Sequence, residues 1–91
     1  MDERVQVHVS GHVQGVGFRY YAAHVAKDLG VRGTIRNTID GGVEAVVEGP
    51  RPTLDEFVDA LRKGPHAAEV TDVTTAWSQS SGEFSDFAVV P

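Results

Sequence analysis

The chain has 91 residues, which suffice for one domain and leave no room for a second hydrophobic core. Its formal net charge of -5 argues against nucleic acids and anionic membranes as general partners. The absence of cysteine excludes disulfides, thiolate metal sites and a cysteine-based phosphatase mechanism. The start, Met1-Asp2-Glu3-Arg4, carries three charged side chains, and no long apolar run follows it. We therefore expect neither a signal peptide nor a membrane span, and a cytoplasmic location.

The first half of the chain shows one helical and three strand patterns. Residues 4–10 alternate strictly, with three valines on one face, which predicts a strand. Residues 18–29 carry an apolar stripe at helical spacing, and Gly30 stands where a left-handed cap belongs. Two further strands are predicted over residues 31–38 and 42–49, because Asp40-Gly41 between them is a strong hairpin signal.

The second half predicts another helix and one or two strands. Thr53 and Glu56 fit a capping box for a helix that ends at Gly64-Pro65, although Pro52 offers a competing start. Residues 70–78 read as a fourth strand and residues 84–90 as a short fifth, with a turn between them.

The element order is therefore β-α-β-β-α-β with a terminal strand. This order is typical of the ferredoxin-like sandwich, in which two helices cover one face of a sheet. We predict a single α+β domain over residues 1–91, with a mixed, mostly antiparallel sheet and a short fifth strand at the C-terminus.

The connection between the first strand and the first helix is rich in glycine. Gly11, Gly15 and Gly17 fall within seven residues, and such spacing lets successive N–H groups converge on one anion at a helix start. Arg19 lies in the first helical turn, where a cation is expected only if an anion binds nearby. A plain glycine-rich turn beside a solvated arginine is the alternative. Nucleotide motifs are missing, because Tyr20 stands where a third glycine would be and no Gly-Lys-Ser/Thr follows.

Asn37 ends the second predicted strand on the same side as Ile35. A right-handed crossover makes the first two strands parallel, so their carboxyl ends lie at one edge of the sheet. With the third strand between them, Asn37 and the loop would be roughly 10 Å apart, or two interstrand spacings. An asparagine at the rim of a core face needs a partner or a function, and the alternative is a simple turn-forming residue.

Two ordered motifs resemble the signatures of the acylphosphatase family. The first is Gly11-His12-Val13-Gln14-Gly15-Val16-Gly17-Phe18-Arg19, and the second is Gly33-Thr34-Ile35-Arg36-Asn37, continuing through Gly41-Gly42-Val43 to Gly49. The resemblance covers nearly the whole chain, including Gly64-Pro65. It implies a ferredoxin-like hydrolase that converts carboxyl phosphates to a carboxylate and inorganic phosphate.

The same resemblance implies roles for particular residues. Arg19 matches the arginine that binds the substrate, and Asn37 matches the asparagine that orients the attacking water. The phosphate cradle matches the backbone amides of Gly15, Val16, Gly17, Phe18 and Arg19. No cofactor or metal is implied. Thr34 and Ile35 depart from the family pattern, from which we expect altered packing or substrate fit and unaltered chemistry. Residues 88–91 lack the basic and aromatic residues with which the family usually ends, and this departure concerns the contacts of the last strand.

Two other functions compete with hydrolysis. An RNA-recognition domain has the same element order, but residues 43–48 are acidic and aliphatic where such a domain carries a basic-glycine-aromatic signature. A non-catalytic module that binds phosphate or carbamoyl phosphate in a larger assembly is the second, and the chain length and the presence of both Arg19 and Asn37 argue against it. We expect a monomer that binds a small acyl phosphate, releases inorganic phosphate, and binds neither nucleic acid nor membrane.

Overall fold

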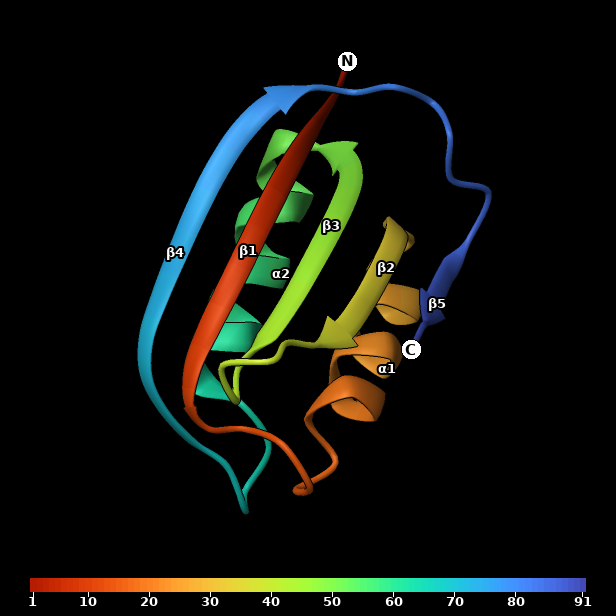
Figure 1. Ribbon diagram of the computed structural model, residues 1–91. Coiled ribbons are helices and arrows are strands. Elements are labelled where there is room, and N and C mark those ends of the chain that lie inside the picture. Colours follow the sequence, from red (N-terminus) through yellow and green to blue (C-terminus); the bar gives the residue numbers. More distant parts are fainter.

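Two helices and five strands follow one another in the predicted order in a computed structural model that describes all 91 residues (Figure 1). Their bounds are β1 (Asp2–His12), α1 (Phe18–Leu29), β2 (Arg32–Asn37), β3 (Val43–Pro50), α2 (Arg51–Lys63), β4 (Glu69–Gln79) and β5 (Phe87–Val89). Neither helix is long and apolar enough to cross a membrane.

The strands form one sheet in the order β4-β1-β3-β2-β5, and both helices lie on the same face of it (Figure 1). All neighbours are antiparallel except β2 and β5. The ferredoxin-like sandwich and its mixed, mostly antiparallel sheet are thus confirmed. Val43, at the start of β3, pairs with Val9 on one side and with Asn37 on the other. The carboxyl ends of β1 and β2 therefore flank the start of β3, as the crossover rule predicts.

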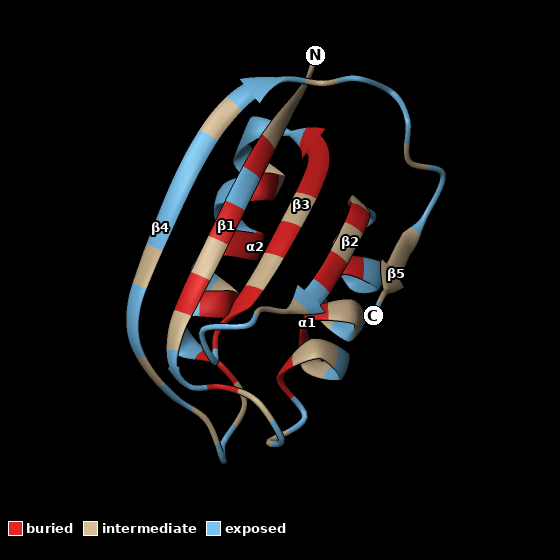
Figure 2. Cartoon of the chain, in the orientation of Figure 1, coloured by how far each residue is buried: buried red, intermediate tan, exposed pale blue.

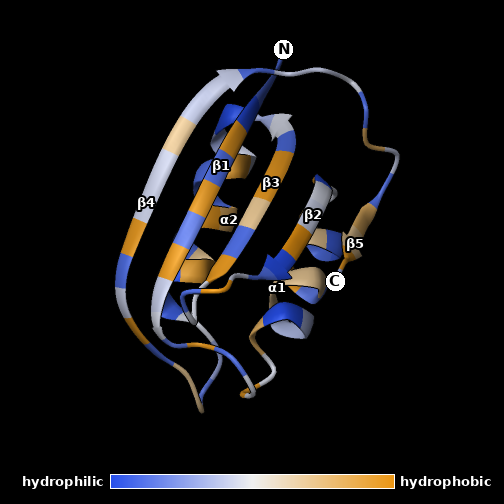
Figure 3. Cartoon of the chain, in the orientation of Figure 1, coloured by the Kyte–Doolittle hydropathy of each residue, from blue (hydrophilic) through white to orange (hydrophobic).

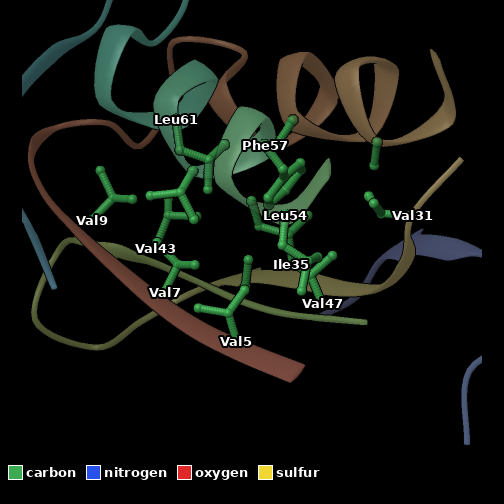
Figure 4. Close-up of a cluster of buried hydrophobic side chains, with 14 of the residues drawn as sticks. Val5, Val7, Val9, Val31, Ile35, Val43, Val47, Leu54, Phe57 and Leu61 are labelled. Atoms are coloured by element: carbon green, nitrogen blue, oxygen red, sulfur yellow. The ribbon is translucent and has the colours of Figure 1, made fainter. Parts of the chain in front are cut away.

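The core lies between the sheet and the helices. Along β1, hydrophobic and hydrophilic residues alternate (Figure 3), and this alternation coincides with buried and less buried positions (Figure 2). The valines of β1 and β3 and Ile35 of β2 meet residues of α2 across this layer (Figure 4). The largest buried side chains from the two helices are Phe18, Leu54, Phe57 and Leu61. This packing holds the start of α1 and the end of β2 in fixed places beside each other.

The start of α2 differs from the capping-box prediction. The helix begins at Arg51, Pro50 is its N-cap, and no side chain caps its first N–H groups. Pro52 explains the earlier start, because its fixed φ suits the first turn and its missing N–H costs no hydrogen bond there. The capping box of Thr53 and Glu56 is therefore wrong.

Gly11 belongs to β1 and not to the loop that follows. It pairs with Val70 of β4 next to a register shift, and its φ is +126°. A Cβ at this position would lie 2.1 Å from the carbonyl oxygen of Glu69, so a close approach of two backbones requires the glycine. The connection that can form an anion site is reduced to residues 13–17.

Candidate active site

The loop of residues 13–17 is anchored at both ends by buried side chains, Val13 and Phe18. Between them, Gly15 and Gly17 adopt left-handed conformations with φ of +73° and +77°. A Cβ would meet nothing within 4 Å at either position, so the backbone conformation and not space demands glycine. Gly17 is the N-cap of α1 and supplies no capping side chain. The first N–H groups of α1 therefore remain available to a ligand.

Arg19 is half-buried in the first turn of α1 and makes no ion pair. Arg4, Arg32, Arg36 and Arg51 each lie within 4.0 Å of a carboxylate, whereas Arg19 does not. A guanidinium without a carboxylate partner beside free helix N–H groups produces a local positive site in a chain of net negative charge. This site can attract an anion.

A pocket of about 190 Å³ joins the loop to the end of β2. Its lining consists of Val13, Gly15, Gly17, Phe18, Arg19, Tyr20 and Asn37. The volume lies below the roughly 300–1,000 Å³ of pockets that hold drug-sized ligands. It can hold a group of about the size of a phosphoryl group.

Asn37 brings a buried acceptor to this pocket. Its Oδ1 is buried and has no hydrogen-bond partner within the protein. Buried polar atoms are nearly always hydrogen-bonded, so an acceptor left without one points to a bound water or ligand group. Since β2 pairs with β3 up to Asn37, the backbone that carries this amide is held in the sheet.

Gln14 ties the loop to the β2–β3 turn. Its Nε2 donates to the carbonyl oxygens of Thr38 and Gly42, at 2.8 Å each. Thr38 directly follows Asn37, so the side chain of Gln14 bridges the two walls of the pocket. No role for Gln14 was predicted from the sequence. A long amide side chain among glycines and valines was the only local signal.

The turn itself is held by a network around Asp40. This carboxylate accepts hydrogen bonds from the Thr38 hydroxyl and the Gly42 N–H, and these bonds lower the pKa of Asp40. The Nε2 of His8 lies 3.3 Å from the same carboxylate. A Cβ at Gly42, directly before β3, would lie 2.6 Å from the carbonyl oxygen of Val9, so only glycine fits there without a shift of the backbone. The turn after Asn37 is thus fixed against β1.

The structure brings most of the residues selected from the sequence to one place. Gly15, Gly17, Phe18, Arg19 and Asn37 all line the small pocket. Val16 does not line it, and its side chain packs against the hydrophobic core. The pocket wall therefore offers backbone N–H groups, a guanidinium and an amide, and these groups can bind an anion and a water molecule together.

Comparison with known proteins gives a consistent result. The family model for acylphosphatase matches residues 5–89. A curated acylphosphatase of Methanothrix thermoacetophila is 46% identical over 86 residues, which cover 94% of this chain and 94% of that protein. The crystal structure of acylphosphatase from Bacillus subtilis is 36% identical, covers 98% of this chain and 99% of that one, and superimposes with a TM-score of 0.94. The structure of an acylphosphatase from Coxiella burnetii is 34% identical, covers 98% of this chain and 93% of that one, and superimposes with a TM-score of 0.92.

Proposed function

We propose a residue-level mechanism for this chain, which belongs to the acylphosphatase family and hydrolyses small acyl phosphates. Arg19 and the amides of residues 15–19 hold the phosphoryl group, and Asn37 orients the water that attacks it. The observation that carries the proposal is the shared pocket, because Arg19, which makes no ion pair, and Asn37, whose buried Oδ1 has no hydrogen-bond partner, line the same small space.

The phosphoryl site follows from charge. In a loose transition state the phosphoryl oxygens keep their negative charge, so catalysis asks mainly for positioning and for positive groups around them. The free N–H groups at the start of α1 and the guanidinium of Arg19 can position the phosphoryl group and place positive charge around its oxygens. Gly15 and Gly17 let the backbone wrap close to the anion without side chains in the way.

Asn37 can hold water without acting as a base. Its Oδ1 accepts one hydrogen bond from the water, which leaves an oxygen lone pair free to attack phosphorus. The bond between phosphorus and the acyl oxygen breaks as the new bond forms, and the carboxylate leaves. The water proton goes to a phosphate oxygen, so no side chain of the pocket has to change its protonation state. Carboxylates are good leaving groups, and no strong acid is needed.

Replacing Arg19 tests the phosphoryl site. We expect Arg19→Ala to lower kcat for benzoyl phosphate by about 100- to 1,000-fold, the usual effect of removing one transition-state donor, and to weaken binding of inorganic phosphate. Arg62→Ala is the matched control, because Arg62 is exposed on the last turn of α2 and also makes no ion pair. Near-normal hydrolysis by Arg19→Ala would refute the assignment.

We propose that the chain acts as a cytoplasmic monomer without nucleic-acid partners. Glu69 and Asp72 place carboxylates on β4, the longer of the two edge strands with which another chain could pair. The sheet face away from the helices carries Gln6, His8, Glu44, Thr74 and Ala76, and so lacks the aromatic platform that stacks RNA bases. Light scattering after size exclusion should give the mass of one chain, and single-stranded RNA should cause no mobility shift.

A further inference from the structure

A second and larger hollow lies next to the small pocket. This groove has a volume of about 700 Å³ and runs along α1. Its other walls come from the start of β2 and the segment before β5, which lie beside α1 (Figure 1). Tyr20 lines both this groove and the small pocket. Tyr20 is 69% exposed and therefore available to a ligand. Further along, the apolar part of the wall comes from Ala23, Val31 and Phe87.

The groove also holds an unpaired cation. Eight residues are Lys or Arg, and four of them make no ion pair: Arg19, Lys27, Arg62 and Lys63. Arg19 lines the small pocket, and Lys27 lines the groove. Of the other basic groups there, Arg32 is bonded to Asp2 at 2.5 Å, and His24 lies 3.5 Å from Asp28. Lys27 is therefore the groove cation that is free to pair with a ligand.

The helix sets the distance between Tyr20 and Lys27. Seven residues are two turns, so both side chains lie on the same face and their Cα atoms are about 10 Å apart along the axis. Helical side chains lean toward the N-terminus, so the lysine, about 6 Å long, brings its ammonium back toward Tyr20. A rigid acyl group that starts at the small pocket can pass over Tyr20 and end near this ammonium.

The small pocket leaves the acyl group outside. At about 190 Å³ it accommodates the phosphoryl group and the water, whereas the acyl chain must extend into neighbouring space. Since Tyr20 is common to both hollows, the groove is that space. Asp86 also faces the groove, but the hydrogen bond from the Gly33 N–H to its backbone carbonyl fixes it beside the first residues of β2. An anionic ligand group is thus favoured on the side of Lys27 and disfavoured next to Asp86.

We propose that this groove binds the acyl part of the substrate and favours acyl groups with an apolar body and an anionic group at the far end. Tyr20 contacts the apolar body, and Lys27 pairs with the anion. The inference rests on the proposed function, because the phosphoryl group must occupy the small pocket for the acyl group to reach the groove.

The test compares benzoyl phosphate with 4-carboxybenzoyl phosphate, whose carboxylate carbon lies about 8 Å from phosphorus by summed bond lengths. The readout is the ratio of kcat/KM for the two substrates. We expect the wild-type protein to prefer the carboxylated substrate about three- to fivefold, as one exposed ion pair allows. This ratio should approach one in Lys27→Gln and fall toward one in 0.5 M NaCl. Lys63→Gln, which removes an unpaired lysine outside the groove, should keep the wild-type ratio.

A wild-type ratio at or below one would overturn the proposal, and so would an unchanged ratio in Lys27→Gln. Tyr20→Ala provides a second readout, since loss of the ring should lower kcat/KM for benzoyl phosphate more than for acetyl phosphate. Equal losses on both substrates would contradict the role of Tyr20 in the groove. A different result would refute the proposed function itself: Arg19→Ala would then hydrolyse benzoyl phosphate at nearly the wild-type rate.

Discussion

Gln14 is the residue that connects the two walls of the pocket. Its amide donates to two carbonyl oxygens in the β2–β3 turn, which begins one residue after Asn37. In the proposed mechanism, the water held by Asn37 and the phosphoryl group held by the loop must stay in line, and a displacement of about 1 Å can cost roughly 100-fold in rate. We therefore propose that Gln14 acts on the reaction by fixing the position of the loop relative to the β2–β3 turn.

We expect Gln14→Ala to lower kcat about tenfold, because the loop and the turn lose their common anchor while the functional groups remain. Binding of inorganic phosphate should change little, since the N–H groups and Arg19 are still present. Gln6→Ala is the control, because Gln6 also donates from Nε2 but to Glu44 on the open face of the sheet. Phosphate affinity that falls in step with kcat, or an unchanged kcat, would show that Gln14 has no positioning role.

The proximity of Arg19 and Asn37 could be predicted from the sequence, because glycine spacing, strand alternation and crossover handedness are local or general rules. The role of Gln14 could not. Its partners stand 24 and 28 residues further along the chain, and only the folded sheet brings them within reach. Likewise, the orphan Oδ1 of Asn37 depends on packing that no periodicity reveals.

At the scale of elements, the contact between β1 and β4 depends on Gly11. The Cβ of any other residue would collide with the backbone of Glu69, so the two strands would have to separate. The sequence pattern could not distinguish this glycine from those of the loop, because close approach of two strands leaves no local signal. At the start of α2, by contrast, two local signals competed, and Pro52 outweighed the capping pattern of Thr53.

We expect Gly11→Ala to lower the free energy of unfolding by about 3 kcal/mol, the upper range for inserting a methyl group into tightly packed structure. Gly15→Ala should cost only about 1 kcal/mol, since space is free there and only the left-handed backbone is strained. Urea unfolding of both variants gives the comparison. Equal losses would show that β1 and β4 adjust to the methyl group.

At the scale of the whole molecule, Glu48 gathers parts of the chain that are far apart in sequence. It is fully buried at the end of β3 and accepts hydrogen bonds from Ser80, Ser81 and Gly82, and from Arg4 at 3.0 Å. Ser80, Ser81 and Gly82 belong to the loop that leads from β4 to β5 on the opposite edge of the sheet, and Arg4 belongs to β1 (Figure 1). Burial would raise the pKa of Glu48, but the hydrogen bonds from Ser81, Gly82 and Ser80 outweigh it and lower the pKa to about 2.

This carboxylate should make stability depend on pH. Because its pKa in the folded state lies below its ordinary 4.5, the stabilisation is complete above about pH 4.5 and is lost as the pH falls toward 2. We expect the free energy of unfolding of Glu48→Gln to be about 3 kcal/mol lower than that of wild type at pH 7. Between about pH 4.5 and pH 2, this free energy should fall less in Glu48→Gln than in wild type. Glu44→Gln, on the same strand, should follow the wild-type curve. Parallel curves for Glu48→Gln and wild type would contradict this role.

In the proposed mechanism, phosphate binding and water activation are divided between Arg19 and Asn37. Asn37→Ala tests it most directly, by calorimetric titration with inorganic phosphate and by benzoyl phosphate turnover on the same preparation. We expect phosphate affinity within about twofold of wild type and a kcat lowered about 100-fold or more. Loss of phosphate affinity in step with turnover, or turnover close to that of wild type, would contradict the account.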